Sequence, residues 1–145
     1  MVDDEWVIAA ALEAVLSDAG YRVLTAANGR QGLERLGEAR PDAVLLDVMM
    51  PVLDGPGMLA ALAADPVHRD IPVVLMSSLP EGTVARLAGG QHRAFLPKPF
   101  LAPDLLRVLE RVLAGADTSI EPATDICGER LQRAVRATAV TENGR

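Results

Sequence analysis

The stretch Ala43-Val44-Leu45-Leu46-Asp47 sets a carboxylate directly behind four consecutive apolar residues. An unbroken apolar run, with no alternation of polar residues, is typical of a strand that is covered on both faces. A second run of this kind, Ile71-Pro72-Val73-Val74-Leu75-Met76, ends in Ser77 and Ser78. Doubly covered strands occur in parallel sheets between two layers of helices, so the two stretches predict an α/β fold.

The rest of the chain extends this pattern in both directions. Apolar runs predict strands at Tyr21–Ala26, Ala43–Leu46, Ile71–Met76 and Ala94–Leu96, and helical periodicity predicts helices at Trp6–Ala19, Arg30–Ala39, Met58–Ala64, Thr83–Ala88 and Asp104–Ala114. Strict alternation of strand and helix implies right-handed crossovers and a doubly wound parallel sheet. The pattern fades after Gly115, and Glu129–Ala139 is the one helical candidate beyond it.

Composition excludes several classes of function. Only 3% of the 145 residues are aromatic, which argues against a stacking platform for single-stranded nucleic acid. A formal net charge of −6 disfavours nonspecific binding to nucleic acid or to an anionic membrane surface. No apolar run is long enough to span a bilayer, and the single Cys127 is compatible with a reducing compartment. We therefore expect a cytoplasmic protein with neither nucleic acid nor membrane as partner.

Polar residues stand at the ends of the predicted strands and just before the first helix. They are Asp3, Asp4, Asp47, Ser77, Ser78 and Lys98. Ligands of an open parallel sheet bind at the carboxyl ends of its strands, so we expect these side chains to converge. Carboxylates that share a site repel one another unless a cation joins them, and hard oxygen ligands suit Mg²⁺. A cation beside an ammonium group would form a pocket for an anion, for which a phosphoryl group is the best candidate.

Each of these residues also has a plainer interpretation. Asp3 or Asp4 could cap the first helix, because aspartate is a favoured N-cap residue. The serines could satisfy local backbone groups. Lys98 is the only lysine among 14 basic residues and stands between two prolines. Chance could place it there, but a site that needs a compact point charge in place of a planar guanidinium explains the exception better.

Four motifs, in their order along the chain, together resemble those of the CheY-like receiver domain of two-component response regulators. The resemblance covers about residues 3–114 and rests on Asp3-Asp4-Glu5, on Leu45–Pro51 followed by Val52–Gly55, on Val74–Ser78, and on Phe95–Phe100. They are similar, in turn, to the family's acidic cluster, its phosphoacceptor strand and loop, its switch hydroxyl, and its switch aromatic with a Lys-Pro pair.

The resemblance implies a flavodoxin-like fold with strand order 2-1-3-4-5. It assigns residues 1–114 to a receiver domain and leaves residues 115–145 as a tail with no output domain. Only Met1 and Val2 precede the acidic cluster, so most of the family's first strand is missing from this chain. That strand lies in the middle of the sheet, and its loss would leave two unpaired edges. The natural chain starting upstream is our preferred explanation; otherwise another segment, or a second chain in a swapped or dimeric arrangement, fills the position.

The resemblance also implies a chemistry. A histidine kinase or a phosphotransfer protein would donate a phosphoryl group to Asp47. Mg²⁺ would be held by Asp4, Asp47 and the backbone carbonyl of Met49, with Asp3 acting through water.

Three further residues would respond to the phosphoryl group. Lys98, following the same resemblance, would neutralise a phosphoryl oxygen and would form a cis peptide bond with Pro99. Ser77 would hydrogen-bond the phosphoryl group, and Phe95 would turn inward and reshape the face formed by residues 83–88, 94–96 and 104–114. A downstream protein would read that face. For Phe95, simple core packing is the alternative, because aromatic side chains usually belong in cores.

The resemblance therefore implies a signalling switch and not an enzyme, with only self-phosphorylation and self-dephosphorylation expected. Two alternatives stay open. One is a Mg²⁺-dependent phosphatase of the haloacid dehalogenase type, although Met49 stands where such enzymes carry a second aspartate. The other is a degenerate receiver that binds partners without phosphorylation. A homodimer is also left open.

Overall fold

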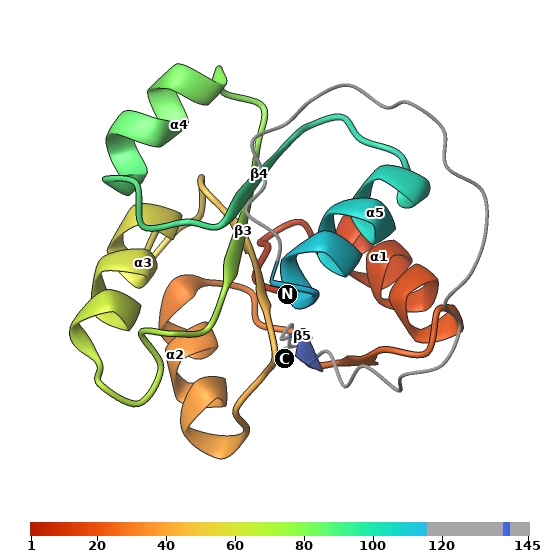
Figure 1. The fold of residues 1–145 in the computed structure, drawn as a ribbon, viewed down its shortest axis with the longest axis horizontal. Coiled ribbons are helices and arrows are strands. Elements are labelled where there is room, and N and C mark those ends of the chain that lie inside the picture. The colour runs from red at the N-terminus through yellow and green to blue at the C-terminus, as the bar shows by residue number, and fades with distance from the viewer. Residues whose placement is uncertain (116–137, 140–145) are drawn as a thin grey trace.

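The computed structural model describes residues 1–115 and Thr138–Ala139, and Figure 1 shows the arrangement of their helices and strands. Three parallel strands form one regular sheet: β2 (Val44–Asp47), β3 (Val73–Ser77) and β4 (Ala94–Pro97), in that order. Every residue of β2 and β3 is buried, as the unbroken apolar runs predict.

Helices cover both faces of this sheet. The elements on one face are α1 (Trp6–Asp18) and α5 (Ala102–Leu113), and those on the other are α2 (Gly29–Glu38), α3 (Gly55–Ala64) and α4 (Glu81–Ala88). Successive strand residues point to opposite faces. Leu45 and Val74 therefore pack with α1 and α5, whereas Leu46 and Leu75 pack with α2, α3 and α4. The prediction of a doubly wound parallel α/β fold is confirmed.

Four helices, α2 to α5, begin one to three residues earlier than their periodicity predicts. We expected α3 to begin at Met58, but it begins at Gly55 because the Asp54 carboxylate accepts a hydrogen bond from the Gly57 amide at 2.8 Å. Pro56 fits in this first turn because its missing N–H would have no intrahelical partner there. Helix α5 begins at Ala102, two residues before the expected Asp104. Within the part of the chain that the structure describes, no helix is long and apolar enough to cross a membrane.

The chain's first residues take part in the sheet. Val2 forms parallel bridges to both Ala26 and Leu46, so it lies between the segment that carries β1 (Arg22–Val23) and β2. The strand predicted over Tyr21–Ala26 is regular only at Arg22–Val23. Across the sheet the order is therefore β1, Val2, β2, β3 and β4. If Val2 is counted as the end of a first strand, this is the order 2-1-3-4-5 that the resemblance implies.

The tail contributes a strand where a helix was expected. Thr138–Ala139 form β5, which pairs in parallel with β1. The predicted helix over Glu129–Ala139 is therefore wrong at these two residues, because pairing with an open strand edge outweighs the local helical pattern. The rest of that predicted helix, residues 129–137, lies outside the described residues.

Candidate functional site

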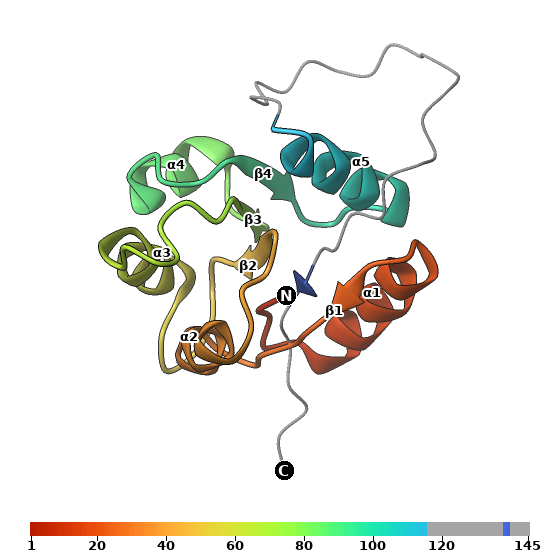
Figure 2. The same ribbon diagram turned by 60° about the horizontal axis from the view of Figure 1, so that its bottom comes forward.

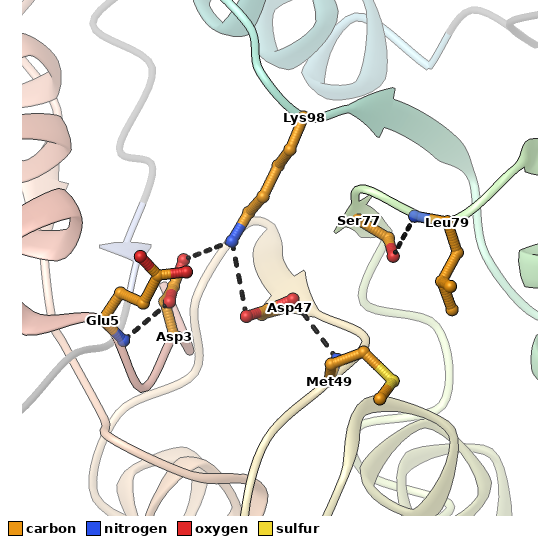
Figure 3. Close-up of polar contacts among 7 residues, drawn as sticks. All are labelled: Asp3, Glu5, Asp47, Met49, Ser77, Leu79 and Lys98. Atoms are coloured by element: carbon orange, nitrogen blue, oxygen red, sulfur yellow. Dashed lines mark hydrogen bonds and ion pairs between the residues drawn. The ribbon is translucent and has the colours of Figure 1, made fainter.

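The carboxyl ends of the parallel strands meet at one edge of the sheet, and Figure 3 shows the polar side chains gathered there. Asp47 is the last residue of β2, Ser77 the last of β3, and Lys98 directly follows β4. Asp3 directly follows the bridging residue Val2. The topology thus brings together side chains that are up to 95 positions apart in the sequence.

The Lys98 ammonium group forms ion pairs with two carboxylates, those of Asp3 and Asp47. Its Nζ lies 3.1 Å from Asp3 Oδ2 and 3.4 Å from Asp47 Oδ2. The side chain of Asp3 is 0% exposed, that of Asp47 6% and that of Lys98 16%, so these ion pairs are shielded from solvent. Low exposure strengthens charge interactions, but it also makes each unpaired charge costly.

Backbone amides hold the two buried carboxylates in place. The Glu5 amide donates to Asp3 Oδ1 at 2.9 Å, and the Met49 amide donates to Asp47 Oδ1 at 3.3 Å. The N-cap of α1 is Glu5, which makes no side-chain capping bond. The alternative in which Asp3 or Asp4 is the N-cap of the first helix is therefore wrong, and the Asp3 side chain faces Lys98 instead.

The charges of the site perturb one another. Burial raises the pKa of Asp47; the Asp3 carboxylate adds to this rise, and Lys98 opposes it without cancelling it. Burial alone would lower the pKa of Lys98, but the Asp3 and Asp47 carboxylates outweigh burial, so the pKa of Lys98 is raised. The site therefore favours an additional positive charge.

A divalent cation fits this charge balance. Asp3, Asp4 and Asp47 each offer a carboxylate oxygen, and these oxygens lie within 4.8 Å of one another. Asp3 and Asp47 are buried, whereas Asp4 is exposed. Three carboxylates against one ammonium leave an excess of negative charge, and their oxygens are the hard ligands that Mg²⁺ prefers. The donor set therefore suits Mg²⁺.

Ser77 and Phe95 adopt the plainer of their two predicted roles in this structure. Ser77 is buried, and its Oγ accepts a hydrogen bond from the Leu79 amide at 3.1 Å, which is a local backbone role. Phe95 is 4% exposed and packs in the core with residues of α3 and α4, such as Leu62 and Val84. The Lys98–Pro99 peptide bond is cis.

Sequence reasoning missed two residues that support the site. The Val2 amide donates to the Leu45 carbonyl at 2.7 Å, and the Val2 carbonyl accepts from the Asp47 amide at 2.8 Å, so Val2 fixes the end of β2. Gly55 packs so closely beneath this strand end that a Cβ there would lie 2.5 Å from the Asp47 carbonyl oxygen. The turn Leu53-Asp54-Gly55 behind a strand-end aspartate was the available signal for Gly55.

The fold and the site together define a class: parallel α/β domains that can bind a cation and an anionic group at one edge of the sheet. A family model described as the response regulator receiver domain matches residues 1–110. The chain therefore belongs to the receiver domain family of two-component response regulators, which confirms the resemblance.

Similar proteins agree with this assignment. Over 115 residues the chain is 38% identical to the transcriptional regulatory protein PrrA of Mycobacterium leprae and 36% identical to the response regulator MprA of Mycolicibacterium vanbaalenii. Each match covers 78% of this chain and 48% of the relative, so the chain spans about half the length of these curated relatives. They are named as regulators and not as enzymes.

Solved structures resemble the fold. The receiver domain of a Pseudomonas aeruginosa sensor histidine kinase has a TM-score of 0.72 and 30% identity, covering 78% of this chain and 93% of that one. That structure holds a magnesium ion in its active-site cleft. The chemotaxis protein CheY4 of Vibrio cholerae has a TM-score of 0.72 and 32% identity, covering 77% and 93% of the two chains.

Proposed function

We propose that this receiver domain, residues 1–114, is a phosphorylation-dependent switch in which Asp47 accepts a phosphoryl group from a histidine kinase or a phosphotransfer protein. The observation that carries the proposal is the contact of Lys98 Nζ with both Asp3 and Asp47, in a site that holds two further carboxylates beside Asp47. The function would place the protein in the cytoplasm. Its downstream partner would be a protein that reads the face formed by α4, β4 and α5.

The positions of Asp47 and Lys98 support the following chemistry. An Asp47 carboxylate oxygen attacks the phosphorus of a phosphohistidine whose other ring nitrogen is protonated; the P–O bond forms, the P–N bond breaks with its electron pair going to nitrogen, and neutral imidazole leaves. Lys98 Nζ binds an oxygen of the incoming group and offsets its charge. Asp4, Asp47 and the Met49 carbonyl would hold Mg²⁺, with Asp3 acting through water; the ion supplies further charge neutralisation on the phosphoryl oxygens.

Ser77 and Phe95 would change their contacts when Asp47 is phosphorylated. The Ser77 hydroxyl, which now accepts from the Leu79 amide, would donate to a phosphoryl oxygen instead. Movement of Ser77 at the end of β3 would free space beside β4, whose Phe95 packs against Leu75 of β3. A change in the packing of Phe95 would then alter the face that a partner contacts.

Intact-mass measurement after incubation with acetyl phosphate tests the acceptor. We expect wild type to gain one phosphoryl group only when Mg²⁺ is present, and Asp47→Asn to gain none. Asp54→Asn is the matched control, because it removes a nearby carboxylate that caps α3 and keeps the cap's acceptor oxygen. Equal labelling of wild type and Asp47→Asn would refute the assignment.

No structural observation favours the phosphatase alternative. Met49 stands two residues after Asp47, where such an enzyme needs a second acid, and this residue is 62% exposed. A Mg²⁺-dependent release of phosphate from acetyl phosphate that continues over many turnovers would favour that alternative over the switch.

A further inference from the structure

A second pocket lies beside the acidic site, between the start of α1 and the segments that follow β3 and β4. We call it the α1 pocket. Its volume is about 490 Å³, within the range of about 300–1,000 Å³ that is typical of small-molecule sites. Of the four charged residues that form the acidic site, only Lys98 also lines this pocket. The α1 pocket is therefore a separate space that shares one wall with the site of the proposed function.

Most of the lining of the α1 pocket is apolar. Ile8 and Leu12 lie four residues apart on α1 and so share one face of that helix, and Pro99 and Phe100 follow β4. Leu12 is buried, and Ile8 and Phe100 are partly buried and pack against the same core cluster. Because core packing holds these side chains, the pocket can accept an apolar group without a rearrangement of the fold.

Three polar side chains complete the lining: Glu5, Ser78 and Lys98. In Figure 3, Glu5 comes from the segment before α1 and Lys98 from the segment after β4. Hydrogen bonding of the Glu5 amide to Asp3 Oδ1, at 2.9 Å, fixes the backbone of Glu5. Among the described residues, however, neither the Glu5 carboxylate nor the Ser78 hydroxyl has a hydrogen-bond or ion-pair partner. Both groups are thus available to a ligand.

The charges around the α1 pocket determine the sign of the ligand that it favours. The Glu5 carboxylate and the three carboxylates of the acidic site face one ammonium group, that of Lys98. Lys98 is already paired with Asp3 and Asp47. Even with a divalent cation bound in the acidic site, an excess of negative charge would remain. An anionic ligand would therefore be repelled, and a cationic ligand would be attracted.

We propose that the α1 pocket is a binding site for a small organic cation, whose apolar body packs against Ile8, Leu12 and Phe100 and whose positive group pairs with Glu5. The Ser78 hydroxyl offers such a ligand one further hydrogen bond. This site goes beyond the proposed function and is independent of it, because Asp47 does not line the pocket.

Titration of the wild-type chain with benzamidine, an aromatic ring that carries an amidinium group, tests the site. The readout is the set of amide resonances of ¹⁵N-labelled protein, in metal-free buffer at neutral pH. We expect saturable shifts centred on the amides of Glu5, Ile8, Ser78 and Phe100, with a Kd on the order of 1 mM, as suits a fragment-sized ligand.

Two matched compounds separate the charge of the ligand from its apolar body. Benzoate keeps the ring and reverses the charge, whereas acetamidine keeps the charge and lacks the ring. We expect each of them to bind at least about threefold more weakly than benzamidine, because each loses one of the two contributions.

Two carboxylates of the same region of the chain provide matched variants. Glu5→Gln keeps the size of the side chain and removes its charge, so it should weaken benzamidine binding by about three- to fivefold, the effect of a partly exposed ion pair. Glu13→Gln is the control, because Glu13 is exposed on α1 but does not line the pocket. Glu13→Gln should bind benzamidine with the wild-type Kd. The amide spectra show directly that both variants are folded.

Each other outcome would overturn the proposal. The absence of saturable shifts would mean that the pocket takes no such ligand. Shifts at Met49 and around Asp47, with none at Ile8 and Phe100, would place benzamidine in the acidic site instead. Equal binding of benzoate, or an equal Kd for wild type and Glu5→Gln, would refute the pairing with Glu5. A chain that binds benzamidine as expected but gains no phosphoryl group from acetyl phosphate would keep the α1 pocket and lose the proposed function.

Discussion

Replacing Lys98 by methionine is the perturbation that most directly tests the electrostatics of the site. Methionine keeps most of the apolar stem and removes the ammonium group. With an effective dielectric constant of about 20, each ion pair, at 3.1 Å to Asp3 and at 3.4 Å to Asp47, is worth about 5 kcal/mol before desolvation. Taking the ammonium out of water cancels much of this attraction, and removal of one partner of a buried ion pair leaves a net cost of about 3–5 kcal/mol.

The assay is urea denaturation at pH 7 in EDTA. At this pH Lys98 is charged in both states, because its folded pKa is raised above the ordinary value of 10.5, and its contribution is lost only as the pH rises through that folded pKa. For a urea dependence of about 1–3 kcal/mol per molar, we expect the midpoint of Lys98→Met to fall by roughly 2 M. In an Asp47→Asn background the same substitution should cost less, by about 1–3 kcal/mol, because one of its two partners is already neutral.

Either of two results would refute this reasoning. A midpoint for Lys98→Met equal to that of wild type would mean that the ion pairs contribute nothing. An equal cost in the wild-type and Asp47→Asn backgrounds would mean that Lys98 and Asp47 are not coupled.

Three further predictions follow from the same contacts. Because the pKa of Asp47 is raised, the folded protein binds the Asp47 proton more tightly than the unfolded chain does, so metal-free stability falls as the pH rises from about 3.8 through the folded pKa. Asp47→Asn should lack this fall and should be more stable than wild type at pH 7. Identical pH profiles of stability for the two proteins would contradict this prediction. Gly55→Ala should lower stability by about 1–3 kcal/mol in denaturant titrations, because its Cβ would lie 2.5 Å from the Asp47 carbonyl oxygen and 2.7 Å from Val48 Cα. Gly37→Ala, with nothing within 4 Å, is its control and should not destabilise. Asp54→Ala should cost about 1 kcal/mol through loss of the α3 cap, and an unchanged midpoint would rule that cap out as a source of stability.

The arrangement of the site could be predicted from the sequence wherever it depends on topology. Parallel strands end at one edge of the sheet, so residues that follow unbroken apolar runs meet there. This is why Asp47 and Lys98 were expected together, and the structure brings them within 3.4 Å. The fold class followed from the same runs, because local strand and helix patterns agree with the global topology.

The rest depends on contacts that no local pattern contains. The local pattern over Glu129–Ala139 indicates a helix, but whether Thr138–Ala139 form a strand depends on the open edge of β1, more than a hundred positions earlier. The partner of the Ser77 hydroxyl depends on the path of the chain at Leu79. The start of α3 was misplaced because a cap and a proline set it, and apolar periodicity is silent about both.

Locating the modified residue is the most direct test of the central claim. After incubation with acetyl phosphate and Mg²⁺, borohydride reduction converts an aspartyl phosphate into homoserine, which tandem mass spectrometry can place in the sequence. We predict homoserine at position 47 and at no other aspartate, in particular neither Asp3 nor Asp4. Homoserine at another position, or none in protein whose denaturation curve shows it to be folded, would contradict Asp47 as the phosphoacceptor.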